Sequence, residues 1–202
     1  MSDNQGPIGP NEAIKVSKIE TFVLKNSWVF VKISTDAGIT GWGEMLKDDA
    51  KACAAGALDV ADYLVGKDPR PVVHHWQAIH RGAFYRGGPI KTAISSGIDM
   101  ALWDIIGKAA DMPLYKLWGG EKEKIIPYAS MVVLSTPEER AEQARSLQEE
   151  GWQAMKLRLH NETMADDIKI VEAVRDAVGD DFTIMVDANQ AQSSGTWQPG
   201  VM

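Results

Sequence analysis

Residues 152–187 have the sequence WQAMKLRLHNETMADDIKIVEAVRDAVGDDFTIMVD, and this stretch decides the fold class. Two short runs rich in apolar residues, Trp152 to Leu159 and Phe182 to Asp187, are typical of strands. Between them, Ala165 to Val178 has the apolar spacing of a helix. The order strand, helix, strand predicts two parallel strands joined by a right-handed crossover.

The preceding residues repeat this pattern. Ile125 to Leu134 is predicted to be a further strand, and Thr136 to Glu150 a helix with Pro137 in its first turn. A spacing of about 30 residues from strand to strand fits successive strand–helix units. We therefore expect a parallel sheet covered by helices in residues 121–202.

A different architecture is expected before Gly120. Turn residues Asp36-Ala37-Gly38 separate β-rich runs and predict a three-stranded antiparallel meander, with strands at Lys15 to Leu24, Trp28 to Thr35 and Ile39 to Glu44. Helical patterns follow at Asp48 to Val65, at Val72 to Arg81, and after Gly87-Gly88-Pro89. We expect an α+β unit over residues 14–120, preceded by a flexible leader at residues 1–13.

Composition narrows the class of protein. The chain has 202 residues, of which 45% are hydrophobic and 24% charged, as in ordinary globular proteins. A net charge of −7 gives no electrostatic support for a nucleic-acid or anionic-membrane partner. The apolar runs are shorter than a membrane span, the N-terminus has no secretory signal, and Cys53 is the only cysteine. We expect a cytoplasmic protein without disulfides.

Charged residues gather where the predicted parallel strands end, which is where active sites of α/β proteins lie. Alternation along the strand places Lys156, Arg158 and His160 on one face, and Asp187 and Asn189 share a face at the end of the next strand. Charges facing inward need a carboxylate, a metal or a ligand as compensation, and Asp187 is the candidate. A structural Lys–Asp ion pair, or charges that point to water, are alternative interpretations.

Several motifs together resemble the amino-terminal domain of the enolase superfamily. They are Gly41-Trp42-Gly43-Glu44, Gly97-Ile98-Asp99-Met100-Ala101-Leu102-Trp103-Asp104, Gly107-Lys108, Pro113, Tyr115, Leu117 and Gly119-Gly120. The resemblance is to the mandelate racemase / muconate lactonizing enzyme branch. Within it, Trp28 to Ile33 and Phe84 to Ile90 resemble the sugar-acid (galactonate-like) dehydratases.

The resemblance implies a fold and a cofactor. Residues 14–120 would be an α+β capping domain, and residues 121–202 the first β/α units of an incomplete TIM-type (β/α) barrel, because a whole barrel takes about 250 residues. The family binds Mg²⁺ and a small carboxylate substrate, and uses a Lys or His base. The opposite-face base and the remaining metal ligands are expected on later barrel strands. A homo-oligomer is expected for the full-length form.

The same resemblance implies roles for individual residues. Lys156 and Arg158 occupy the family's Lys-x-Lys position, so Lys156 would be the acid/base for the α-proton or would position the substrate carboxylate. Arg158 stays protonated at any working pH, so it would hold a carboxylate or lower the pKa of Lys156 by repulsion. Asp187 matches the first metal ligand. Residues assigned to substrate binding are Asn189, Trp28, Tyr85, Arg86 and His160.

Three functional hypotheses follow. The first is a Mg²⁺-dependent dehydratase of a sugar acid or hydroxy acid, inactive as this 202-residue chain. A racemase, epimerase or cycloisomerase of the same superfamily is the second. The third is a non-catalytic fragment that serves as an oligomerisation or binding module.

Other conspicuous residues are interpreted structurally. Gly41 to Glu44 is expected to be a packing motif, and Asp99 and Asp104 to lie on a helix surface or interface. His74, His75 and His80 lack the i, i+4 spacing of a helical metal site and are expected to be partly exposed.

Overall fold

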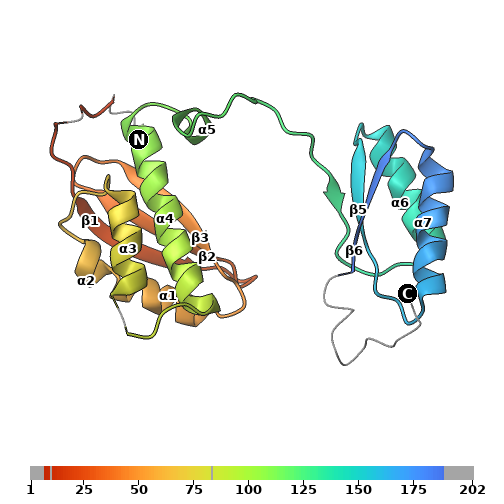
Figure 1. The fold of residues 1–202 in the computed structure, drawn as a ribbon, viewed down its shortest axis with the longest axis horizontal. Helices are drawn as coiled ribbons and strands as arrows, with labels where there is room; N and C mark the ends of the chain where they lie inside the picture. The colour runs from red at the N-terminus through yellow and green to blue at the C-terminus, as the bar shows by residue number, and fades with distance from the viewer. Residues whose placement is uncertain (1–6, 10, 83, 189–202) are drawn as a thin grey trace. The chain divides into compact units, whose positions relative to one another are not determined.

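The computed structural model describes residues 7–9, 11–82 and 84–188. It divides into two compact units, Met1–Glu121 and Lys122–Met202, which are described separately below (Figure 1).

The first unit is built on the predicted antiparallel meander. Its strands are β1 (Val16–Val23), β2 (Val29–Thr35) and β3 (Thr40–Met45), in the order β1-β2-β3. Alternate residues of β2, namely Val29, Val31 and Ile33, are fully buried. This two-residue period gives the sheet one apolar face that forms the core of the unit.

Helices cover that apolar face (Figure 1). Those against the strands are α1 (Ala50–Asp59), α2 (Ala61–Leu64) and α4 (Pro89–Ala109), while α3 (Val72–Arg81) and α5 (Leu114–Leu117) pack against α4. The single helix predicted over residues 48–65 is wrong in one respect, because it is interrupted at Val60, whose backbone N–H turns to the carbonyl of Leu58. The short α5 was not predicted. The long α4 contributes nine buried residues.

Two glycines of β3 allow the sheet to touch α4 directly. A Cβ atom on Gly41 would lie 1.9 Å from the carbonyl oxygen of Ala101, and one on Gly43 would lie 1.9 Å from that of Gly97. No side chain fits in either place, so the interpretation of this motif as a packing feature is confirmed. Asp104 reinforces the contact by accepting the backbone N–H of Trp42 at 2.9 Å.

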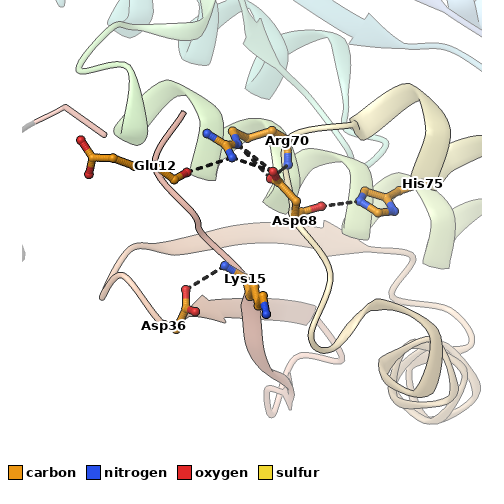
Figure 2. A network of polar contacts seen from close by, with 6 residues as sticks. All are labelled: Glu12, Lys15, Asp36, Asp68, Arg70 and His75. Carbon is orange, nitrogen blue, oxygen red and sulfur yellow. Dashed lines mark hydrogen bonds and ion pairs between the residues drawn. The ribbon is translucent and has the colours of Figure 1, made fainter. Parts of the chain in front are cut away.

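A polar network ties the segment before β1 to the connection between α2 and α3 (Figure 2). Arg70 pairs with Asp68 at 2.6 Å and also donates to the Glu12 carbonyl at 3.0 Å. His75 Nε2 lies 2.6 Å from the Asp68 carbonyl, which can only accept, so Nε2 carries the proton. Nδ1 forms a hydrogen bond with the Tyr63 hydroxyl at 3.0 Å.

His75 is therefore not the partly exposed residue expected from the sequence. Only 2% of its surface is exposed, because both of its ring nitrogens find partners inside the unit. Beside this network, the backbone N–H of Lys15 donates to Asp36 at 2.7 Å, which fixes the entry into β1.

The second unit holds the predicted parallel sheet. Its strands are β4 (Ala129–Ser130), β5 (Ala154–Arg158) and β6 (Thr183–Asp187), in the order β4-β5-β6, with α6 (Pro137–Glu149) and α7 (Met164–Val178). The core lies between sheet and helices and includes Met155, Leu157 and Val174. No helix in the described ranges is long and apolar enough to cross a membrane.

The strand predicted over residues 125–134 is wrong in length. Only Ala129 and Ser130 pair with β5. Pro127 has no N–H to offer a ladder, and Ile125 and Ile126 are 87% and 71% exposed in the described part of the chain. An apolar run without a neighbouring strand to pair with does not satisfy its backbone groups as a strand.

Candidate functional site

The charged residues of β5 and β6 meet at the carboxyl end of the parallel sheet. Met155 and Leu157 of β5 point into the core, so Lys156 and Arg158 lie on the other face, where both are half-buried. Arg158 is in register with Asp187, the last residue of β6. A small pocket of about 90 Å³ lies here, and it is lined by Ser130, Met131, Val132, Lys156, Arg158 and Asp187.

Lys156 and Asp187 form an ion pair in this pocket. The Lys156 Nζ atom lies 2.9 Å from Asp187 Oδ2, and 26% and 39% of the two side chains are exposed. The ammonium also lies over the Tyr128 ring, 5.9 Å from its centroid. The Lys–Asp ion pair that the sequence left open as an alternative is therefore present. An ion pair is compatible with a functional role for either residue.

This contact sets the proton affinity of Lys156. The hydrogen bond that Lys156 donates to Asp187 raises the pKa of the Lys156 amine, and this effect outweighs both the partial burial and the repulsion by Arg158, which lower that pKa. The expectation that Arg158 lowers the pKa of Lys156 is therefore wrong in its net result. Arg158 acts in the expected direction, but its effect is smaller than that of Asp187.

The Arg158 guanidinium uses one N–H group in a hydrogen bond to the backbone, and another N–H group has no acceptor among the described residues. Its Nη1 donates to the Val132 carbonyl at 2.6 Å. Its Nε atom is buried and has no hydrogen-bond partner among the described residues. A buried N–H without an acceptor is unfavourable by about 1–3 kcal/mol, and an oxygen of a bound ligand would relieve it.

The other predicted site residues lie elsewhere or cannot be placed. His160 follows β5, is half-buried, and is not among the described residues that line the pocket. Asn189 lies outside the described residues. Trp28, Tyr85 and Arg86 belong to the first unit, where all three are exposed. The Tyr85 carbonyl accepts from Lys91 at 2.5 Å.

One carboxylate is available for a metal ion in the pocket. Mg²⁺ prefers oxygen ligands and often takes only one or two carboxylates together with water and substrate. Asp187 fits that requirement as one ligand. Within residues 7–9, 11–82 and 84–188, no group of three or more His, Cys, Asp or Glu side chains gathers as a metal site.

Sequence reasoning missed the contribution of the segment around β4. The Tyr128 ring lies below the Lys156 ammonium. Two further residues, Ser130 and Val132, line the pocket, and the Val132 carbonyl accepts a hydrogen bond from Arg158. Pairing of the predicted strand with its neighbour could have revealed this contribution, since Ser130 is in register with Lys156. The sequence did not fix that register, because the predicted strand extended over residues 125–134.

Comparison with protein families gives two matches. Residues 11–119 match the family described as mandelate racemase / muconate lactonizing enzyme, N-terminal domain, and residues 139–198 match the enolase C-terminal domain-like family.

Curated relatives include two D-galactonate dehydratases. That of Pectobacterium atrosepticum is 38% identical over 195 residues, covering 89% of this chain and 51% of the relative. That of Ralstonia nicotianae is 47% identical over 108 residues, or 53% of this chain and 28% of the relative. The chain thus spans about half the length of the first of these relatives, and less of the second.

Solved structures with the same fold include members of this superfamily. The 3,6-anhydro-D-galactonate cycloisomerase of Zobellia galactanivorans is 34% identical, with a TM-score of 0.78, over 88% of this chain and 52% of that protein. A member of the enolase superfamily from Salmonella Typhimurium is 31% identical, with a TM-score of 0.78, over 86% of this chain and 54% of that protein.

Proposed function

The chain belongs to the mandelate racemase / muconate lactonizing enzyme family, and from this premise we propose that the whole protein is a Mg²⁺-dependent dehydratase of a sugar acid or a related hydroxy acid. The observation that supports it most directly is the cluster of Lys156, Arg158 and Asp187 at the carboxyl end of the parallel sheet. The similarity to D-galactonate dehydratases supports the choice of a sugar acid.

Asp187 holds the metal ion in this proposal. A bound Mg²⁺ supplies positive charge that stabilises the anion formed when a carboxylate substrate loses its α-proton. The Asp187 carboxylate accepts from Lys156, so a bound Mg²⁺ would compete with the Lys156 ammonium for it.

Lys156 transfers the α-proton. Its amine must be neutral to accept a proton, and the Asp187 hydrogen bond opposes this by raising the pKa of Lys156. Lys156 is therefore a proton donor while paired with Asp187, and it becomes a base only when that carboxylate has another partner. The position of the ammonium in the pocket fits both roles.

Arg158 binds the substrate carboxylate. A guanidinium stays protonated, so it is a poor base but a good ligand for a carboxylate. The contact with Val132 leaves Nε as a donor without an acceptor among the described residues.

The remaining assignments extend the same proposal. Asn189, His160, Trp28, Tyr85 and Arg86 are assigned to substrate binding in the whole protein. The protein would work in the cytoplasm as a homo-oligomer, on a small carboxylate substrate. The 202-residue chain alone would not convert the substrate, because its described part supplies only one carboxylate, Asp187, to the metal ion.

A product assay on the protein at the length of its relatives tests the proposal. Dehydration of a 2,3-dihydroxy acid gives a 2-keto-3-deoxy acid, so D-galactonate and related sugar acids with Mg²⁺ should give a 2-keto product. Absence of that product across the panel would contradict the dehydratase. Racemised or cyclised products would instead favour a racemase, epimerase or cycloisomerase of the same superfamily. The similarity to a cycloisomerase makes this alternative worth testing.

A further inference from the structure

The β4–α6 loop, residues 131–136, lies beside Arg158 in the pocket at the carboxyl end of the parallel sheet. Val132 and Val133 in this loop are 65% and 74% exposed, so packing of their side chains does little to hold the loop. Hydrogen bonds to their backbone carbonyls hold it instead. The Val132 carbonyl accepts from Arg158 Nη1 at 2.6 Å, and the Val133 carbonyl accepts from Arg140 Nη2 at 2.5 Å. Two successive carbonyls are thus each bound by a guanidinium, one from β5 and one from α6.

Arg140 occupies a position that is unfavourable for a cation. Only 5% of its surface is exposed, and its hydrogen bonds among the described residues go to two neutral acceptors, the Val133 carbonyl and the Gln143 side chain. Burial lowers the pKa of the Arg140 guanidinium, although the neighbouring Glu139 carboxylate opposes this. Arg140 also lies near the N-terminus of α6, where the helix dipole disfavours positive charge. Stability alone therefore does not account for this residue.

The β4–α6 loop links Arg140 to Arg158. The carbonyls of Val132 and Val133 belong to successive planar peptide groups, so fixing one restricts the other. Arg140 fixes the second of them, and the Met131 N–H is fixed on the other side by a hydrogen bond of 2.9 Å to a carbonyl of β5. The Val132 carbonyl then has few orientations left. It decides where Arg158 Nη1 is held and, because a guanidinium is planar, where the unpartnered Nε of Arg158 points.

We propose that Arg140 is a positioning residue that acts through the β4–α6 loop and holds Arg158 in the orientation that binds the substrate carboxylate. This inference rests on the proposed function, in which Arg158 is the ligand of that carboxylate. Arg140 itself is not among the residues that line the pocket. A guanidinium binds a carboxylate well only when its N–H groups face the carboxylate, so the orientation of Arg158 should set the affinity for the substrate.

Steady-state kinetics of the protein at the length of its relatives test this assignment. Arg140→Met removes both hydrogen bonds but keeps a long side chain, and it should raise the KM for the reacting sugar acid about five- to tenfold with kcat changed less than about twofold. Arg140→Lys keeps a cation and a donor and should raise KM by about twofold or less. Arg145→Met is the matched control, because Arg145 is an exposed arginine of the same helix, and it should behave like the wild type.

A double-variant cycle separates positioning from a general structural effect. Arg158→Met should raise KM by about tenfold or more, because it removes the ligand of the carboxylate. If Arg140 acts only through Arg158, adding Arg140→Met to Arg158→Met should raise KM no further. Increases in KM that multiply would show that Arg140 affects the substrate by another route, and would overturn the assignment.

NMR of the 202-residue chain tests the link between the two arginines without any reaction. The buried Arg158 Nε–H gives a signal in a sample with isotope-labelled arginine, and the signal is identified by its absence in Arg158→Lys. Its hydrogen exchange with solvent should be about tenfold faster, or more, in Arg140→Met than in the wild type and in Arg145→Met. Arg140→Gln replaces Arg140→Met in both experiments if circular dichroism shows that the methionine variant has not folded.

Equal exchange of the Arg158 Nε–H in the wild type and in Arg140→Met would overturn the assignment whatever the activity. Faster exchange with an unchanged KM would also overturn it, because the loop would then not serve the substrate. Failure of the proposed function gives a different result, since no sugar acid would react even with the wild-type protein. The exchange measurement then decides by itself whether Arg140 orients Arg158.

Discussion

Lys156 is subject to two opposing requirements at the scale of single residues. Its pairing with Asp187 keeps the amine protonated, because the hydrogen bond raises its pKa. Removal of an α-proton needs the neutral amine. The sequence predicted which residues meet here, since alternation and strand order are simple rules. It did not predict the net direction of the pKa shift, because that depends on a distance of 2.9 Å.

Replacement of Lys156 tests its role in proton transfer. In the catalytically complete protein, Lys156→Ala should lower exchange of the substrate α-proton with deuterated solvent by about 10²–10⁴-fold, because general acid–base groups contribute that much. Proton NMR of the substrate in deuterated buffer measures the exchange, and Mg²⁺ binding should remain. Undiminished exchange would show that another group removes the proton.

Asp187→Asn tests the assignment of the metal ligand. An amide oxygen carries no charge, so Mg²⁺ affinity measured by titration calorimetry should fall by about tenfold or more. Lys156→Met is the matched control, because it removes the competing ammonium while leaving the carboxylate and should not weaken binding. Equal affinities for Asp187→Asn and the wild type would leave Asp187 as a structural ion-pair partner only.

The Asp68–Arg70 pair makes a testable contribution to acid stability. The hydrogen bond from Arg70 lowers the pKa of Asp68 below its ordinary value of 3.8. A lowered carboxyl pKa stabilises the fold above the unfolded-state pKa, and this stabilisation is lost as pH falls through the folded-state value. The pair is partly exposed, so its contribution is only about 0.5–1 kcal/mol.

Arg70→Met should therefore lower the melting temperature at neutral pH and have little effect once Asp68 is protonated at strongly acid pH. Differential scanning calorimetry across the acid range measures the difference. A destabilisation that does not change with pH would mean that Arg70 acts through its contact with the Glu12 carbonyl instead.

Elements were predictable where a sequence pattern and a tertiary partner agree. The meander, α4, α6, α7 and the buried parts of β5 follow from periodicity, turn residues and Pro137 in the first turn of α6. The structure adds a capping box between Thr136 and Glu139, which the sequence analysis did not use. β4 was overestimated because an apolar run becomes a strand only where a neighbour pairs with it, and Ala129 and Ser130 alone have that neighbour.

The contact between β3 and α4 depends on glycine and can be tested at the scale of these elements. Gly43→Ala would place a methyl group 1.9 Å from the Gly97 carbonyl, so the strand and the helix must separate. We expect a loss of about 1–3 kcal/mol in the free energy of unfolding, as for other overpacked cores. Urea denaturation measures it.

Ser34→Ala is the control for that experiment, because Ser34 lies on the outer face of β2 and its change adds no atoms next to α4. It should change stability by less than about 0.5 kcal/mol. A Gly43→Ala protein as stable as the Ser34→Ala protein would show that the sheet can move away from the helix at little cost.

At the scale of the whole molecule, the two units differ in how well their backbone is protected. In the first unit α4 contributes nine buried residues and covers the sheet. In the second unit β6 is the last strand in the order β4-β5-β6, and Val186 within it is 58% exposed. An edge strand leaves alternate backbone groups without a partner strand, so it opens more easily than a buried helix.

Hydrogen exchange of the 202-residue chain should show this difference. Amides of residues 94–106 in α4 should exchange most slowly, since they open only when the unit unfolds, and amides of residues 183–187 should exchange at least about a hundredfold faster. Mass spectrometry of peptides from the two regions measures the rates. Equal protection of both regions would mean that β6 has a partner along its open edge, and dilution would show whether that partner is another copy, because protection would then fall with protein concentration.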